Sequence, residues 1–147
     1  MSEKNVKHIK WMKRAIHLAS LGDGKTSPNP MVGAVILDKN GNIISEGFHF
    51  KAGMPHAEAM AFNNLKKDAT GGSMYVNLEP CCHQGKTPPC VDKIISSGLK
   101  KIYVSIKDPD KRVSGKGIKL LKEAGIQVHL GLCKKESLEL NKAFVYK

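Results

Sequence analysis

Hydrophobic residues near the N-terminus recur at the spacing of an α-helix. They lie three or four positions apart, at Ile9, Met12, Ile16 and Ala19. This pattern predicts a helix over residues 6–20. Two β-like runs follow at residues 31–37 and 42–48, and the tetrad DKNG between them is typical of a hairpin turn. This part of the chain is therefore expected to form a helix and an antiparallel pair of strands.

Strand-like and helix-like segments alternate through the rest of the chain. Further strands are expected at residues 73–78, 101–106 and 127–132. Helices are expected at about residues 56–66, 88–97, 117–124 and 137–145. An early hairpin followed by this alternation predicts an α/β fold with a mixed sheet covered by helices on both faces. The pattern contains no linker, so residues 1–147 are expected to form a single domain.

The strongly basic composition changes the expected partners very little. Lysine and arginine total 24 against 13 acidic residues, which gives a formal net charge of +11. Only Arg14 and Arg112 are arginine, and the lysines are spread over nearly every segment. Proteins that read bases and phosphates favour arginine for its bidentate geometry. We therefore expect a solvated basic surface that attracts an anionic substrate, and no nucleic-acid partner.

The chain carries no signal for export or membrane insertion. Its polar N-terminus lacks the apolar centre of a signal peptide, and no apolar run approaches the ~20 residues of a membrane span. We therefore expect a cytoplasmic protein with reduced cysteines and no membrane partner. Two disulfides are the weaker interpretation of the four cysteines in such a protein.

The stretch LEPCCHQGKTPPC, residues 78–90, concentrates three cysteines and a histidine in thirteen positions. A catalytic zinc site needs three protein ligands and one open position. A single histidine or cysteine more often packs than binds metal. Here, however, His56-x-Glu58 precedes Pro-Cys81 and a later Cys90, which is the arrangement of zinc deaminases. We therefore predict zinc on His56, Cys81 and Cys90, with Glu58 as the proton shuttle.

Two cysteines are left outside this ligand set. Cys82 is adjacent to Cys81, and neighbouring cysteines cannot both reach one ion without strain, so Cys82 is expected to be a bystander. Cys133 follows a predicted strand far from the cluster and is expected to pack as a small hydrophobic residue.

Several longer motifs occur in a characteristic order: TSPNPMVGAVI at 26–36, AGMPHAEAMA at 52–61, YVNLEPCCHQGKTPPC at 75–90 and DPDKRVSGKGI at 108–118. With these motifs the chain resembles, essentially end to end, the deaminase domain of the riboflavin-biosynthesis bifunctional deaminase–reductase family. The resemblance implies a three-layer α/β/α cytidine-deaminase-like fold with a five-stranded mixed sheet. It also implies hydrolytic, zinc-dependent deamination of 2,5-diamino-6-ribosylamino-4(3H)-pyrimidinone 5′-phosphate, with Glu58 moving the protons.

The resemblance also assigns residues to the substrate. It implies substrate contacts by Asn29, His49, His83, Lys86, Thr87 and Asp108. The alternatives are structural: a turn residue for Asn29, a surface strand position for His49, a solvated loop tip for residues 83–87 and a turn aspartate for Asp108. Nucleoside and transfer-RNA deaminases usually carry Pro-Cys-x-x-Cys, so the longer gap before Cys90 marks a different substrate class.

The chain departs from the family at several positions. Cys82 stands where serine is common, and Asp110-Lys111 stands in place of Asn-Pro, which leaves the role of Asp110 open. No reductase segment follows within the 147 residues, so we expect a separate reductase polypeptide for the next step. We also expect a homo-oligomer.

Two alternatives remain: a deaminase of another nucleotide or of RNA, and a non-catalytic zinc or RNA-binding module. Glu58 argues against the last, because a structural zinc site needs no general base.

Overall fold

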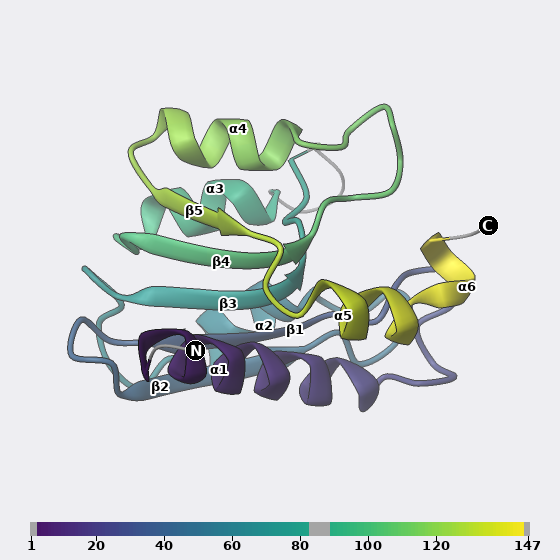
Figure 1. Cartoon of the computed structure of the whole chain (residues 1–147), viewed down its shortest axis with the longest axis horizontal. Helices are drawn as coiled ribbons and strands as arrows, with labels where there is room; N and C mark the ends of the chain where they lie inside the picture. The colour runs from purple at the N-terminus through teal and green to yellow at the C-terminus, as the bar shows by residue number, and fades with distance from the viewer. Residues whose placement is uncertain (1–2, 83–88, 146–147) are drawn as a thin grey trace.

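A single mixed sheet forms the centre of the protein (Figure 1). The computed structural model describes residues 3–82 and 89–145. The strands are β1 (Gly33–Leu37), β2 (Ile43–Phe48), β3 (Ser73–Leu78), β4 (Lys101–Ile106) and β5 (Gln127–Leu130). The helices are α1 (Glu3–Ser20), α2 (Ala57–Asn63), α3 (Cys90–Ser96), α4 (Lys116–Glu123), α5 (Lys134–Leu140) and α6 (Lys142–Val145).

The sheet combines antiparallel and parallel pairing, as the sequence predicted. Its strand order is β2-β1-β3-β4-β5. The pairs β1–β2 and β1–β3 are antiparallel, whereas β3–β4 and β4–β5 are parallel. Parallel neighbours need a crossover connection, and α3 and α4 supply the two crossovers. The carboxyl ends of β3 and β4 therefore lie side by side at one end of the sheet.

Helices cover both faces of the sheet, which confirms the three-layer α/β/α arrangement. The helices α1 and α5 pack on one face, and α2, α3 and α4 pack on the other (Figure 1). Alternate residues of β1 enter the two cores: Ala34 and Ile36 pack toward α2 and α3, and Val35 and Leu37 toward α1. Because both sides are covered, all five residues of β1 are buried.

The C-terminal helix differs from its prediction. The hydrophobic pattern placed one helix over residues 137–145, but α5 begins at Lys134, and α6 begins only after a break at Asn141. Asn141 is buried and directs its side-chain amide to the backbone of Met31. Earlier in the chain, Cys81 lies in the loop after β3, and α3 begins at Cys90, within the helix expected over residues 88–97.

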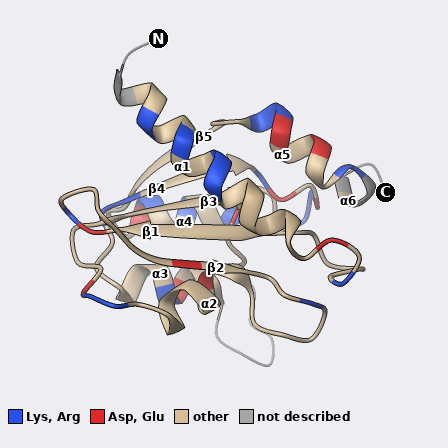
Figure 2. Cartoon of the chain, turned by 90° about the horizontal axis from the view of Figure 1, so that it is seen from below, with Lys and Arg blue, Asp and Glu red and all other residues tan. Residues whose placement is uncertain are grey.

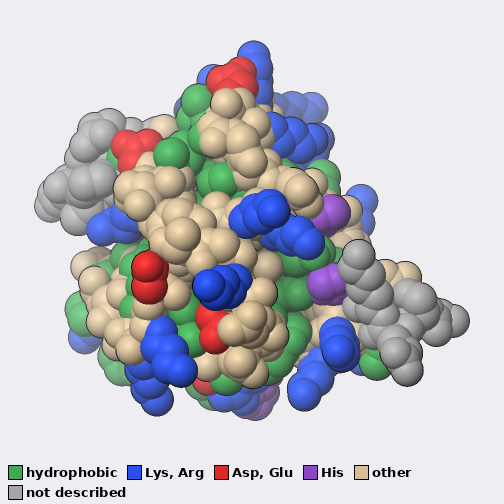
Figure 3. Space-filling view, turned by 90° about the vertical axis from the view of Figure 1, so that its left-hand side faces the viewer, with side chains coloured by type: hydrophobic (Ala, Val, Ile, Leu, Met, Phe, Trp, Pro, Cys, Tyr) green, Lys and Arg blue, Asp and Glu red, His purple; other side chains and the backbone are tan. Residues whose placement is uncertain are grey.

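Charged side chains are scattered over the surface. Lysine and arginine lie on α1, α5 and several loops in Figure 2, and acidic side chains are interspersed among them in Figure 3. One ion pair joins Arg14 of α1 to Glu46 of β2. Within residues 3–82 and 89–145, no helix has the length and apolar character needed to cross a membrane.

Two glycines allow helices to approach the sheet at backbone distance. A Cβ atom on Gly33 would lie 2.1 Å from the carbonyl oxygen of Ala15 in α1. A Cβ atom on Gly47 would lie 2.5 Å from the carbonyl oxygen of Ala57 in α2. The obstructing atoms belong to helix backbones, which cannot move aside like a flexible side chain. Gly47 therefore sets the depth at which α2 packs.

We predict that Gly33→Ala lowers the free energy of unfolding by about 1–3 kcal/mol, because the added methyl group overpacks the contact between α1 and β1. Urea denaturation measures the change. Asn40→Ala, in the exposed hairpin turn, is the control and should change the value by less than about 0.5 kcal/mol. An unchanged midpoint for Gly33→Ala would contradict this account of the interface.

Candidate active site

The candidate site is a cavity at the carboxyl ends of β3 and β4, beside the start of α2. Its volume is about 250 Å³. Apolar walls are supplied by Pro30, Val32, Leu78 and Phe144. The polar lining consists of Asn29, His49, His56, Glu58, Glu79, Cys81 and Asp108. The cavity is slightly smaller than typical drug-sized pockets, so its dimensions suit a single substituted ring.

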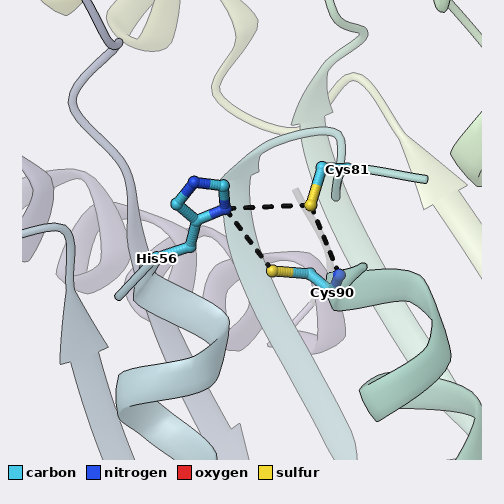
Figure 4. A group of neighbouring side chains, drawn as sticks. All are labelled: His56, Cys81 and Cys90. Atoms are coloured by element: carbon cyan, nitrogen blue, oxygen red, sulfur yellow. Dashed lines mark hydrogen bonds between the residues drawn. The ribbon is translucent and has the colours of Figure 1, made fainter. Parts of the chain in front are cut away.

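Three metal-ligating atoms converge at the edge of this cavity (Figure 4). His56 is the N-cap residue of α2, Cys81 lies in the loop after β3, and Cys90 is the first residue of α3. Their ligand atoms all lie within 4.8 Å of one another. His56 Nδ1 is 3.7 Å from the sulfur of Cys81 and 3.7 Å from the sulfur of Cys90. The fold thus brings together the three residues that the sequence singled out.

The chemistry and spacing of this group fit zinc. One imidazole nitrogen and two thiolates form a donor set that zinc accepts, with bonds of about 2.0–2.3 Å. Ligands arranged tetrahedrally at those lengths are separated by about 3.5–3.8 Å. The two nitrogen–sulfur distances of 3.7 Å lie within that range. Three protein ligands also leave the fourth position that a catalytic zinc requires.

Cys81 is the thiol that the surroundings favour in its charged form. The hydrogen bond from the Cys90 thiol, together with that from His56, lowers the pKa of Cys81 to about 4. The backbone N–H of Cys90 also donates to the Cys81 sulfur, at 3.3 Å. The same hydrogen bond and burial raise the pKa of Cys90. The site therefore already stabilises negative charge on sulfur, as a metal-binding site must.

Glu58 lies in the first turn of α2 with its side chain buried, 3 % exposed. Burial raises the pKa of its carboxyl group to about 7, because a charged group loses hydration in the interior. It lines the same cavity as His56 and Cys81. A buried carboxyl group beside a metal-binding group is the arrangement expected of a general acid–base.

Asn29 and His49 also line the cavity and contact each other. His49 is buried, and burial lowers its pKa, which favours the neutral ring. Its Nδ1 lies 3.1 Å from the carbonyl oxygen of Pro55, so Nδ1 carries the hydrogen and donates it. Nε2 is then the acceptor for the Asn29 side-chain amide, at 3.3 Å. His49 is therefore a buried residue of the cavity and not a surface strand residue.

Asp108 follows β4 and lines the cavity, as expected for a residue after a parallel strand. His83, Lys86 and Thr87 lie outside the described residues. Asp110 is held by Arg112, whose backbone and guanidinium both donate to its carboxylate.

The two remaining cysteines lie outside the metal-binding group, as expected. The side chain of Cys82 packs against the core on the α2–α3 face of the sheet. Cys133 packs against the core beneath α1 on the other face. Among the described residues, the only His, Cys, Asp and Glu group close enough to share an ion contains neither of them.

Five residues of the cavity carry no functional prediction from the sequence: Pro30, Val32, Leu78, Glu79 and Phe144. Glu79 belongs to the Glu-Pro-Cys motif, but the sequence does not predict that it lines the site. Phe144 was treated only as part of the C-terminal helix. Phe144 carries no local signal of a binding role, since an aromatic residue near the end of an amphipathic helix is usually a packing residue. Glu79 is 4 % exposed despite its charge, and only the structure shows this burial.

The segment that carries Asn29 is fixed by buried amides. Asn141 accepts from the backbone N–H of Met31 at 2.7 Å and donates to the Met31 carbonyl oxygen at 2.8 Å. Asn77 donates to the same carbonyl at 3.0 Å and accepts from the N–H of Gly33 at 2.8 Å. The C-terminal segment thus holds one wall of the cavity.

Comparison with known proteins identifies the family. Residues 5–106 match the family described as the cytidine and deoxycytidylate deaminase zinc-binding region. The chain belongs to this zinc-binding deaminase family. It is 51% identical over 134 residues to a diaminohydroxyphosphoribosylamino-pyrimidine deaminase of Buchnera aphidicola subsp. Schizaphis graminum, covering 91% of this chain and 90% of that protein.

Two further relatives are longer than this deaminase-family chain. The riboflavin biosynthesis protein RibD of Aquifex aeolicus is 50% identical, over 91% of this chain and 37% of that protein. The diaminohydroxyphosphoribosylaminopyrimidine deaminase/5-amino-6-(5-phosphoribosylamino)uracil reductase of Thermotoga maritima has a solved structure. It superposes with a TM-score of 0.93 at 43% identity, over 97% of this chain and 41% of that one. The chain thus spans well under half of these relatives, and the expected resemblance to their deaminase domain is confirmed.

We predict that Asn141→Ala lowers the free energy of unfolding by about 1–3 kcal/mol, because it leaves the part-buried N–H of Met31 without its acceptor. Urea denaturation and hydrogen exchange at the Met31 amide measure the effect. Asn64→Ala, which removes an exposed amide donor, is the matched control. Equal losses of stability in the two variants would show that the hydrogen bonds to Met31 contribute no more to stability than an exposed amide does.

Proposed function

We propose that this chain catalyses the hydrolytic deamination of 2,5-diamino-6-ribosylamino-4(3H)-pyrimidinone 5′-phosphate in riboflavin biosynthesis. The products are 5-amino-6-ribosylamino-2,4(1H,3H)-pyrimidinedione 5′-phosphate and ammonia. The observation that carries the proposal is the cavity, in which Glu58 and the metal-binding group lie beside Asn29, His49 and Asp108. The Buchnera relative, which bears the name of this deaminase and matches over nearly its whole length, supports the choice of substrate.

His56, Cys81 and Cys90 are the proposed zinc ligands. Their donor atoms and spacing support this assignment, as does the zinc-binding character of the family. Zinc bound there would supply Lewis acidity, which makes a water molecule an effective nucleophile near neutral pH. The backbone N–H of Cys90 orients the Cys81 sulfur, and α2 holds the His56 ring at the mouth of the cavity.

Glu58 is the proposed proton carrier. Hydrolysis adds water to the C=N bond of the ring carbon that bears the 2-amino group and expels that group as ammonia. Glu58 would accept a proton from the attacking water and deliver it to the ring nitrogen. It would then take the proton of the new hydroxyl group and give it to the departing amino group, so that the ring carbon becomes a carbonyl. Its burial on the first turn of α2 supports this role, because bulk water cannot compete for the proton.

Asn29, His49 and Asp108, which line the same cavity as Glu58, are proposed substrate contacts. His49 is neutral and accepts from the Asn29 side-chain amide, so the Asn29 side chain keeps one N–H and its carbonyl oxygen for a ligand. Asp108 would add a carboxylate. His83, Lys86 and Thr87, in the inserted segment between the cysteines, remain proposed contacts from the resemblance alone.

We propose that a reductase acts on the product in the next step and that it is a separate polypeptide. The Thermotoga relative, whose name joins this deaminase to a reductase, supports the reductase step. The Buchnera relative, which is named as the deaminase alone and is covered to 90%, supports separate polypeptides. We further propose that residues 1–147 form one domain that works in the cytoplasm as a homo-oligomer on a small phosphorylated substrate.

A deaminase of another nucleotide is the second candidate, favoured by the cytidine and deoxycytidylate members of the family. Ammonia release from the diamino substrate, compared with release from deoxycytidylate and from a transfer-RNA anticodon stem, separates the candidates. We expect turnover of the diamino substrate alone. Turnover of deoxycytidylate at a comparable kcat/KM would overturn the proposed substrate.

We predict one zinc per chain, lost in His56→Ala, Cys81→Ala and Cys90→Ala because each removes one of three ligands. Metal analysis of the purified variants measures this. Cys82→Ala is the matched control and should keep its zinc, since its sulfur packs against the core. Loss of zinc from Cys82→Ala together with its retention in Cys81→Ala would show that the ligand assignment is wrong.

Glu58→Gln should keep zinc and fold but lose activity by at least about 10²–10⁴-fold, because the amide cannot carry the proton. Steady-state ammonia release and zinc content, measured on the same preparation, test this. Glu46→Gln, which removes a carboxylate on β2, is the control and should stay active. A Glu58→Gln enzyme that retains more than about a tenth of the wild-type rate would exclude Glu58 as the proton carrier.

A further inference from the structure

The side chain of Glu79 accepts three hydrogen bonds that connect the end of β3 to the β4–α4 loop and to the start of α4. Its side chain is 4 % exposed, directly after β3. Oε1 accepts the backbone N–H groups of Asp108 and Gly115, each at 2.9 Å. Oε2 accepts the N–H of Ile118, in the first turn of α4, at 3.1 Å. The backbone N–H of Glu79 donates to Ile106, the last residue of β4, at 2.9 Å.

These bonds hold both ends of the connection between β4 and α4. Asp108 lies at the beginning of that connection, and Gly115 is the N-cap residue of α4. Inside the loop, the Asp108 carboxylate accepts the N–H of Asp110, which folds the loop on itself without joining it to β3. The carboxylate of Glu79 therefore fixes the loop relative to the strand that leads to the metal-binding group.

Close packing reinforces this connection. A Cβ atom on Gly117 would lie 2.5 Å from the carbonyl oxygen of Pro80 and 3.3 Å from Oε2 of Glu79. The first turn of α4 thus packs at backbone distance on the segment that ends in Cys81. If the loop or α4 moved, the segment that ends in Cys81 would move with it, including the side of that segment that faces the cavity.

The chemistry of the site requires a carboxylate. Three N–H groups point at two oxygens, and a carboxylate can only accept hydrogen bonds. Negative charge is also favoured at the N-terminus of a helix, and charge-assisted hydrogen bonds are the stronger kind. Glutamine at this position would turn a donor toward at least one of the N–H groups, so it cannot satisfy all three.

We propose that Glu79 is the positioning residue for Asp108: it sets the place of the Asp108 side chain in the cavity relative to the metal-binding group. This inference rests on the proposed function, in which Asp108 contacts the substrate. Glu79 itself acts through the loop and α4. A purely structural carboxylate would affect the stability of the fold, whereas a positioning residue also affects substrate affinity through Asp108.

A double-mutant cycle on the zinc-loaded protein separates these roles. We expect Glu79→Gln to lower kcat/KM for the diamino substrate by about tenfold to a hundredfold, chiefly by raising KM, with zinc content unchanged. In an Asp108→Ala background, the same substitution should change kcat/KM by less than about twofold, because the contact it positions is already gone. Equal losses in both backgrounds, or no loss in either, would overturn the inference.

Amide hydrogen exchange tests the positioning without the reaction. In Glu79→Gln, the amides of Asp108, Gly115 and Ile118 should exchange about tenfold faster or more, because each loses a charge-assisted acceptor. Glu46→Gln is the control, because it also removes one negative charge, on β2. It should leave the exchange rates of these three amides at their wild-type values. Wild-type exchange rates in Glu79→Gln would overturn the inference.

The two readouts also distinguish this inference from the proposed function. A zinc-loaded wild type that releases no ammonia from the diamino substrate would refute the function, and amide exchange would then decide on Glu79 alone. If Glu79→Gln fails to fold, Glu79→Asp replaces it in both experiments. Its carboxylate keeps the charge but is one methylene shorter, so the same direction of change is expected in KM and in exchange.

Discussion

The rest of the structure depends on holding one nitrogen and two sulfur atoms within 4.8 Å of one another. The residues that supply them are far apart in the chain, since His56 and Cys90 are 34 positions apart. Cys81 follows β3, and Cys90 begins α3. The backbone N–H groups of Cys90 and Val91 donate to the sulfur and the carbonyl oxygen of Cys81, so the two cysteines lie side by side. On the other side, Gly47 lets α2 pack at backbone distance, which brings His56 to the same point.

Buried polar side chains hold the loops that surround the metal-binding group. Asn141 and Asn77 bind the backbone of Met31, next to the segment of Asn29. Glu79 binds the loop of Asp108 from the opposite side. Buried amides and carboxylates are costly unless every donor and acceptor is satisfied, and satisfied networks fix one conformation. The walls of the cavity therefore have a defined shape although few of their residues belong to regular elements.

The buried carboxyl group of Glu58 is the clearest conflict between stability and the proposed function. Placing it in the interior costs hydration and raises its pKa to about 7. A hydrophobic residue at the same position of α2 would fill the space at lower cost. Local rules are expected to fail at functional sites, and Glu58 lies beside the metal-binding group, inside a deaminase family whose chemistry needs a proton carrier.

The sequence alone determined the elements and the zinc motif, because hydrophobic periodicity is local and a metal imposes ligand types and spacing. It placed all five strands and grouped His56, Cys81 and Cys90 with Glu58. Only the tertiary structure decided the contacts of Glu79 with Asp108 and of Asn141 with Met31, which span 29 and 110 positions. A polar side chain shows its partner only once the chain has folded, because a hydrogen bond depends on distance in space and leaves no periodic pattern in the sequence. The break between α5 and α6 at Asn141 was missed for this reason.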